Sequence, residues 1–543
     1  MNRVLMALDQ GAVEDARALV DEVEVRLARP LEPSLEAQLA WAKGLLRWAE
    51  GDLEAAETEF AVACDGALAG GRLLEGWNVA RAATIVRAAL GRLPNSWLQT
   101  ERALRQEIVA HLTPTDRVFF LANRGDAVDQ DIAAALDRAV DPEATFTALR
   151  VIQGARWGAV NEATDARPRD GGRRASWSTR IWQQLGLRRG FGEEPLDPSW
   201  LPPTCALLYQ VSLEREVAIF VVTRSGCRVV RRRCPRTELA ARAAAAVGEA
   251  SARGTRLSNE LYSPRSALGR LADAVGIDEV TASFGPEISR VFVVPDGPCV
   301  QAPWAALPCG AAPWIERVEI ALVSALRPSQ ARWRLGSGAT LRGIAATHAG
   351  DPPLPFARDD VSQMHGGAWA FASTLASTTE EIERALIGAD GAHCACHGVF
   401  DAEAPSSSGL RVGPGLLDLD AISRLELRRL GLLVLASCWT GALSQLPGRE
   451  FFGVPIALHA AGVGAVIAPL WAVSDQYGPT FARAFWEGAA AEDAVGALAR
   501  VQRRHWRSRH PRLWAPWGVW VDGVGAAYAR GVADLSSDSR QGG

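Results

Sequence analysis

His397 and Cys438 have the side-chain types of a nucleophile and its base. His397 lies at the end of the apolar run GAHCACH, and Cys438 ends a second run, LGLLVLASC. A cysteine attacks a carbonyl carbon as its thiolate, and an imidazole can take the thiol proton and later return it to a leaving amine. The residue types alone leave another interpretation open, because a buried cysteine is often an inert apolar residue and a lone histidine a structural one.

The segments from Cys205 onward alternate between strand-like and helix-like patterns, which indicates an α/β domain. CALLYQV and EVAIFVVT predict a hairpin, and SRVFVVPDG, EIALVSAL and ATLRGIAAT predict buried strands. His397 and Cys438 are 41 residues apart, at the ends of two such runs with one connecting segment. Neighbouring parallel strands would bring both residues to one sheet edge, where ligands bind in such folds. The sequence therefore predicts a parallel-centred α/β sandwich.

Gly398 follows the candidate base directly. A glycine there allows a backbone N–H to point at a substrate carbonyl that a side chain would crowd. With the N–H of Cys438 it would form an oxyanion hole, in which one donor can contribute about 3 kcal/mol. We expect Gly398 to support the oxyanion.

The run from His393 to His397 also contains metal-ligand side chains. On a strand, Cys394 and Cys396 face one way and His393 and His397 face the other. One tetrahedral zinc ion could not readily bind all four side chains. We therefore expect no metal and no cofactor, and a structural role for His393.

The C-terminal region resembles the CHAT family, caspase-like bacterial proteases that are related to separase and often fused to tetratricopeptide repeats. The matching stretches are VFVVPDGPCVQAPWAALP, LPFARDDV, HCACHGVFDAEAP, LVLASCWTG, AAGVGAVIAPLWAVSD and HPRLWAPWGVWVDG. The resemblance implies a caspase-like α/β/α sandwich, Cys438 as nucleophile, His397 as general base and acid, and Gly398 as oxyanion support. One departure is Trp439, which stands where the family often has an acidic residue, so the nearby subsites are expected to differ.

Asp475 lies in LWAVSD, 37 residues beyond Cys438. Separase and related proteases carry an acidic residue in a similar segment, at the floor of the pocket for the residue before the cut. A carboxylate there would select Arg or Lys. The other interpretation is a helix N-cap for the segment that begins at Gln476, for which Asp is well suited.

The first 110 residues have helical periodicity and repeat with a period of 40 residues, marked by Gly11, Gly51 and Gly91. The middle copy resembles a tetratricopeptide repeat in the order of its small and aromatic residues, which are Gly44, Gly51, Ala56, Phe60 and Ala63. An irregular helical bundle is the alternative. We expect an all-α tetratricopeptide-like domain that binds an activating or inhibiting protein and carries no catalytic groups.

Composition changes divide the rest of the chain. We predict helical repeats over 1–110, a helical connector over 111–164, a linker over 165–204, a protease domain over 205–530 and a disordered tail over 531–543. The linker is rich in Arg, Gly and Pro. Its arginines and tryptophans could contact nucleic acid, but no recognised nucleic-acid module accompanies them, so solvated arginines are the favoured interpretation.

The remaining expectations concern location and partners. Residues 451–473 have the length of a membrane span, but Pro455, Gly462, Gly464 and Pro469 divide them, which favours a short helix and a strand. No signal peptide is evident, so we expect a cytoplasmic protein without membrane contact. The sequence and the resemblance together predict a cysteine endopeptidase that cleaves a partner protein, with Arg or Lys before the cut, in a bacterial stress or defence system. The alternative is a scaffold with a caspase-like fold that binds without cutting.

Overall fold

The computed structural model describes residues 2–9, 12–26, 33–90, 92, 95–111, 133, 136–137, 139, 141–149, 198–252, 259–323, 335–346, 353–364, 369–402, 404–445, 451–489 and 493–524. The chain divides into two compact units. The helical unit comprises Met1–Arg117 and Asp165–Pro168, and the sheet unit comprises Val118–Thr164 and Arg169–Gly543. Most of the predicted linker and the whole predicted tail lie outside the described residues.

The described elements of the helical unit are all α-helices. They are α1 (Asn2–Asp9), α2 (Val13–Arg26), α3 (Pro33–Ala49), α4 (Leu53–Ala69), α5 (Leu73–Ala89) and α6 (Asn95–His111). A Cβ atom on Gly44 of α3 would lie 2.5 Å from the Phe60 ring of α4, so the two helices cross closely because Gly44 has no side chain. Gly51, with a φ of 84°, turns the chain between them. The predicted helical region is confirmed and is consistent with repeats.

The sheet unit contains an eleven-stranded sheet in the order β3-β2-β1-β4-β7-β18-β17-β14-β10-β8-β9. Neighbouring strands are parallel except for the pairs β1–β2, β2–β3 and β17–β18. Its strands are β1 (Cys205–Ser212), β2 (Glu216–Thr223), β3 (Gly226–Arg233), β4 (Arg290–Val294), β7 (Glu319–Val323), β8 (Thr340–Ala346), β9 (Ala370–Ala376), β10 (Gly391–Ala395), β14 (Leu432–Ala436), β17 (Ala465–Pro469) and β18 (Trp517–Val521). The predicted hairpin and the parallel-centred α/β sandwich are confirmed.

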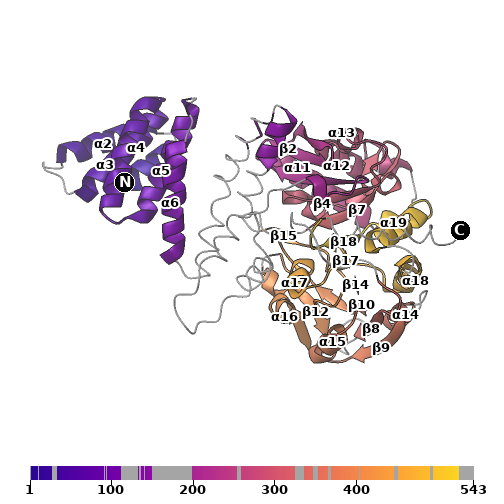
Figure 1. Cartoon of the computed structure of the whole chain (residues 1–543). Coiled ribbons are helices and arrows are strands. Elements are labelled where there is room, and N and C mark those ends of the chain that lie inside the picture. The colour runs from indigo at the N-terminus through magenta and orange to yellow at the C-terminus, as the bar shows by residue number, and fades with distance from the viewer. Residues whose placement is uncertain are drawn as a thin grey trace. The chain divides into compact units, whose positions relative to one another are not determined.

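Helices cover both faces of this sheet (Figure 1). They are α11 (Arg236–Ser251), α12 (Ala267–Val275), α13 (Ile277–Ala282), α14 (Ala357–Ser362), α15 (Thr379–Leu386), α16 (Leu419–Arg424), α17 (Val454–Ala461), α18 (Gly478–Ala489), α19 (Ala494–His505) and α20 (Pro511–Trp514). Small strands complete the unit: β5 (Pro308–Cys309), β6 (Ala312–Pro313), β11 (His397–Val399), β12 (Gly409–Val412), β13 (Gly415–Asp418), β15 (Ser444–Gln445) and β16 (Phe451–Phe452).

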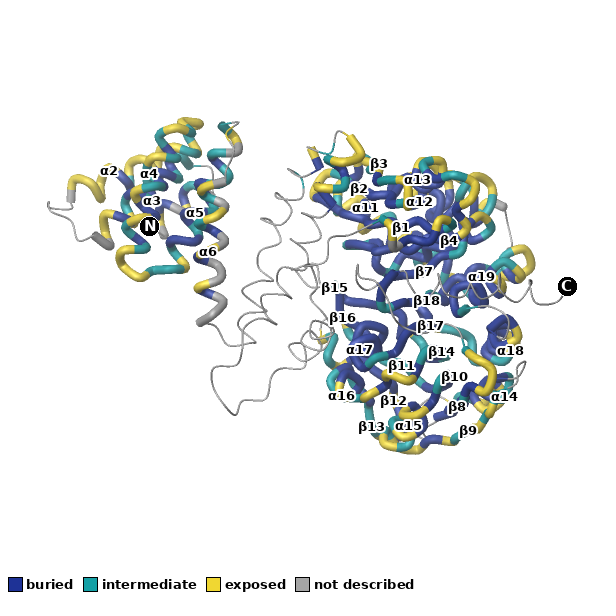
Figure 2. Tube along the Cα trace, viewed as in Figure 1, coloured by how far each residue is buried: buried dark blue, intermediate teal, exposed yellow. Residues whose placement is uncertain are grey.

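The strands alternate their side chains between two apolar cores, which makes the sheet unit three layers thick. On β4, Val291 and Val293 belong to a core that also contains residues of α11, α12 and α15 to α17, whereas Phe292 and Val294 belong to a core that contains residues of α18 and α19. The central strands are accordingly buried along almost their whole length (Figure 2). The expected α/β/α sandwich is the observed architecture.

Local sequence signals explain several of these elements. Thr378 accepts a hydrogen bond from the backbone N–H of Glu381 while the Glu381 carboxylate accepts one from the Thr378 N–H, a capping box that begins α15. The apolar stretch 451–473 folds into α17 and β17 within the sheet unit, as predicted. Among the described residues, no helix has both the length and the apolar character needed to cross a bilayer.

Candidate active site

The strands that carry His397 and Cys438 are neighbours in the sheet. β10 and β14 pair in parallel, with His393 opposite Val434 and Ala395 opposite Ala436. Cys438 lies two residues beyond the end of β14. His397 begins β11, a short strand that leaves the main sheet and pairs antiparallel with β12. The expectation that adjacent parallel strands bring both residues to one sheet edge is therefore confirmed.

Gly398 brings the two strand ends into direct contact. A Cβ atom on Gly398 would lie 2.1 Å from the carbonyl oxygen of Cys438 and 2.8 Å from Cγ2 of Thr440. Those separations are far too short for a real side chain, so the backbone of β11 can approach the Cys438 loop only with glycine at this position. His397, which immediately precedes Gly398, is thereby held beside the loop that carries the thiol.

Cys438 is half-buried, and its Sγ lies 3.9 Å from the backbone oxygen of Val473. Burial raises the pKa of the Cys438 thiol, and the negative charge of Asp475 raises it further. The environment therefore favours the neutral thiol at rest, so a base must remove its proton during the reaction.

Asp475 interacts electrostatically with both Cys438 and His397. It is the first residue of a 3₁₀ turn, η7 (Asp475–Tyr477), whose N-cap position belongs to Ser474. Its Oδ2 accepts a hydrogen bond from the backbone N–H of Phe356 at 3.1 Å, so the carboxylate binds another segment instead of capping its own helix. Burial raises the pKa of Asp475, and the charge of Asp360 adds to this rise while His397 opposes it. The N-cap interpretation therefore does not describe its contacts.

Residues 253–521 match the family model of the CHAT domain. This part of the chain is a CHAT domain. The match begins after β1, β2 and β3, although these three strands belong to the same sheet as the strands inside it. The predicted domain boundary at residue 205 stays a prediction.

Two solved structures of the Saccharomyces cerevisiae separase–securin complex are also similar to this chain. Both are 9% identical and cover 96% of this chain, with TM-scores of 0.45 and 0.41. The alignments cover 49% of the separase chains, so this protein spans about half their length. No curated protein matches the sequence.

His393 of the CHAT domain is fully buried and fixed on both sides. The Trp486 indole N–H donates to His393 Nδ1 at 3.0 Å, and Nε2 on the other side of the ring lies 3.1 Å from Oδ1 of Asp360. Cys394 of β10 and Cys396, which follows the strand directly, both belong to the other apolar core, with their sulfur atoms 3.8 Å apart. No cluster of three or more His, Cys, Asp or Glu residues suited to a metal ion occurs in the described part of the chain. These contacts agree with a structural role for His393.

Trp439 has a backbone conformation that the sequence did not predict. Its φ is 63°, and among the described residues it is the one non-glycine residue with a positive φ. Such a conformation is costly for a bulky side chain and tends to occur at functional sites. The indole is 38% exposed directly beside the candidate nucleophile. One indication that Trp439 is special was present in the sequence, because a tryptophan stands at a position where the family often has an acidic residue.

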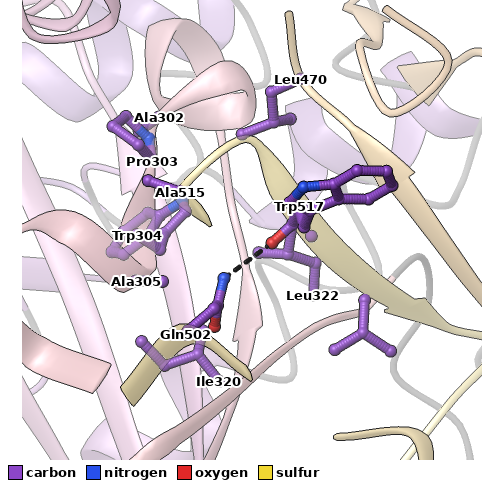
Figure 3. Close-up of a pocket in the computed structure, with 12 residues that line it drawn as sticks. Ala302, Pro303, Trp304, Ala305, Ile320, Leu322, Leu470, Gln502, Ala515 and Trp517 are labelled. Atoms are coloured by element: carbon purple, nitrogen blue, oxygen red, sulfur yellow. Dashed lines mark hydrogen bonds between the residues drawn. The ribbon is translucent and has the colours of Figure 1, made fainter. Parts of the chain in front are cut away.

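An interior cavity of the CHAT domain lies between β7, β18 and α19 (Figure 3). Gln502 projects toward it and donates a hydrogen bond to the Trp517 carbonyl at 2.9 Å. The cavity volume of about 20 Å³ is that of roughly one water molecule. It is therefore too small to receive a peptide side chain.

Iodoacetamide modification should reveal the raised pKa of Cys438. In the substrate-free protein we expect the pH midpoint of the Cys438 modification rate to lie above that of an ordinary cysteine thiol. Asp475→Asn removes a negative charge that disfavours the thiolate, so it should lower this midpoint. Peptide mapping after timed labelling measures both. Burial also raises the pKa of Cys309, the other half-buried cysteine, so Cys309 controls for the substitution and should keep its midpoint in Asp475→Asn. A midpoint near 7 for Cys438 would contradict the neutral resting thiol.

Proposed function

We propose that this protein is a cysteine endopeptidase that cleaves a partner protein, with Cys438 as nucleophile and His397 as general base. The observation that carries the proposal is the contact between the Gly398 backbone and the Cys438 loop, because it holds His397 beside a half-buried thiol at one sheet edge. The CHAT domain match supports a protease-type function for this site.

The chemistry would proceed through an acyl-enzyme. His397 takes the proton of the Cys438 thiol as the sulfur attacks the scissile carbonyl carbon. The backbone N–H groups of Gly398 and Cys438 donate to the oxyanion of the tetrahedral intermediate. The C–N bond then breaks, and His397 gives its proton to the leaving amine. Water, deprotonated by His397, attacks the thioester and releases the new carboxyl terminus.

Asp475 would supply the preference for the residue before the cut. Its carboxylate is half-buried and near both Cys438 and His397, and its hydrogen bond to Phe356 leaves its second oxygen without a hydrogen-bond partner among the described residues. A guanidinium or ammonium group placed next to the nucleophile would meet this negative charge. We therefore infer a protein substrate with Arg or Lys before the scissile bond.

A peptide library tests this function directly. The full chain and its Cys438→Ala variant are incubated with the same mixture of ten-residue peptides, and the products are sequenced by mass spectrometry. Cleavage by the wild type alone supports the endopeptidase. Peptides that bind but are never cut would favour the scaffold function instead.

The helical unit would regulate cleavage, because every candidate catalytic group lies in the sheet unit and repeat arrays present surfaces for partner proteins. The family resemblance supports placing this regulation in a bacterial stress or defence system. We expect a protein that binds the full chain through residues 1–110 to change the rate of peptide cleavage at least tenfold.

The comparison that checks this is a chain lacking residues 1–110, with its folding verified by circular dichroism. It should cleave short peptides and show no response to the bound protein. If the shortened chain responds as the full chain does, the helical unit is not the regulatory surface.

A further inference from the structure

A groove of about 630 Å³ lies beside the candidate nucleophile. It is bounded by α11 on one side, by a 3₁₀ turn, η3 (Gly297–Gln301), on another, and by the segment from Trp439 to Gln445. Trp439, the residue after Cys438, lines the groove, whereas Cys438 and His397 do not, so the groove adjoins the candidate active site through Trp439. Its volume is within the range of cavities that bind small molecules or large side chains.

The residues that line the groove are uncharged, and most are apolar. α11 contributes a row of small residues, including Ala240, Ala244 and Gly248, all exposed on the same helical face. Trp439 and Leu443 contribute larger apolar surface on the other side. The small residues of α11 leave the space open, and the apolar lining would penalise a charged side chain that lost its water there.

Hydrogen bonds hold the segment from Trp439 to Gln445, which forms one side of the groove, in place. Gln445 Nε2 donates to Oδ1 of the buried Asp296 at 3.0 Å, and Oδ2 of Asp296 accepts the Ser212 N–H at 2.7 Å. Gln301 Nε2 donates to the Leu443 carbonyl at 3.2 Å. The segment after Cys438 is thus tied to β1 and to η3, so the groove keeps its shape without a ligand.

Ser444 adds a polar group to this apolar surface. Its side chain lines the groove and is only 8% exposed, and its Oγ has no hydrogen-bond partner among the described residues. A buried hydroxyl without a partner is costly. Because the Oγ atom has almost no accessible surface, a bound peptide amide would reach it only after rotation of the Ser444 side chain, so the open lining of the groove is suited chiefly to an apolar side chain.

We propose that this groove is a substrate subsite for a bulky apolar side chain near the scissile bond. The inference rests on the proposed peptidase function and names a second feature of its substrate, distinct from the basic residue that Asp475 would select. Substrates would carry an aromatic or branched aliphatic residue at one fixed position within a few residues of the cut. Trp439, Leu443 and the α11 face are the determinants of that position.

The test uses the full chain and a matched pair of substitutions on α11. Ala244→Phe fills the groove, whereas Ala245→Phe places the same side chain at an exposed neighbouring position that does not line it. Each variant is incubated with a library in which every position is varied in turn. We expect the wild type and Ala245→Phe to prefer Phe, Leu or Ile over Ala at one position by at least tenfold. Ala244→Phe should lose this preference while still cleaving peptides with Ala there.

A binding measurement separates the two proposals. Each α11 variant is also made in the Cys438→Ala protein, immobilised and exposed to the same library. Apolar peptides retained by the Ala245→Phe protein and lost by the Ala244→Phe protein support the groove even if no peptide is cleaved. If peptides are cleaved without any apolar preference, the subsite proposal is overturned and the proposed peptidase function stands. The same holds if the wild type has an apolar preference that Ala244→Phe leaves unchanged. If the protein shows neither cleavage nor selective binding, both the peptidase function and the subsite are overturned. Trp439→Ala, which removes the opposite wall, should weaken the same preference.

Discussion

Cys438→Ala and His397→Ala should each reduce kcat/KM for peptide cleavage by at least about 1,000-fold, because the two residues act as one unit in forming the acyl-enzyme. Neither change should unfold the protein. Both side chains are only half-buried at a sheet edge, so their removal leaves little cavity and should alter the free energy of unfolding by less than about 1 kcal/mol. Peptide kinetics and thermal unfolding on the same samples measure the two effects separately.

Cys309→Ala is the matched control for this prediction. Cys309 is the other half-buried cysteine, and it contacts Thr281 instead of the candidate site. Its loss should leave kcat/KM unchanged. Cleavage that persists in Cys438→Ala, or is lost equally in Cys309→Ala, would show that the nucleophile lies elsewhere.

Asp475→Asn should reduce cleavage after arginine at least about 100-fold and hardly affect cleavage after a neutral residue. A guanidinium that has lost its water and has no counter-charge costs more binding free energy than the loss of one neutral hydrogen bond. Asn keeps an acceptor oxygen for the Phe356 N–H, so the substitution removes the charge without breaking that contact. Lys substrates should be weaker than Arg substrates in the wild type, because an ammonium group lacks the bidentate geometry.

Two peptides that differ only in Arg or its neutral analogue citrulline measure this effect. Asp359→Asn, at an exposed carboxylate on α14, is the control for the loss of one negative charge. Because burial raises the pKa of Asp475, the preference for Arg should also weaken on acidification, as the carboxylate takes up a proton. Equal Arg-to-citrulline ratios in wild type and Asp475→Asn would refute the pocket role.

The sequence was sufficient to predict those parts of the fold that depend on local pattern. The apolar runs that end near His397 and Cys438 indicated adjacent parallel strands, and the pairing of β10 with β14 confirms this. The start of α15 also rests on a local signal, the capping box of Thr378 and Glu381. Each of these follows from side-chain periodicity or capping within a short segment.

Features that depend on contacts between distant segments were not predicted. The hydrogen bond from the Phe356 N–H to the Asp475 carboxylate joins residues 119 positions apart, and no local sequence pattern reveals it. The raised pKa of Cys438 follows from burial and from the charge of Asp475, both of which require the folded arrangement. The positive φ of Trp439 also has no local sequence signature, because glycine usually occupies such positions.

The most direct measurement for the Cys438–His397 site is covalent trapping by peptidyl chloromethyl ketones with varied residues before the ketone. A peptide seated at the active site holds the chloromethyl group beside the nucleophile, so alkylation there is much faster than at other thiols. Intact-mass and peptide-map analysis should find one adduct per chain, located on Cys438, strongest with arginine and lost in His397→Ala. An adduct on another cysteine, or equal labelling of Cys438 in the wild type and His397→Ala, would contradict a Cys438–His397 peptidase.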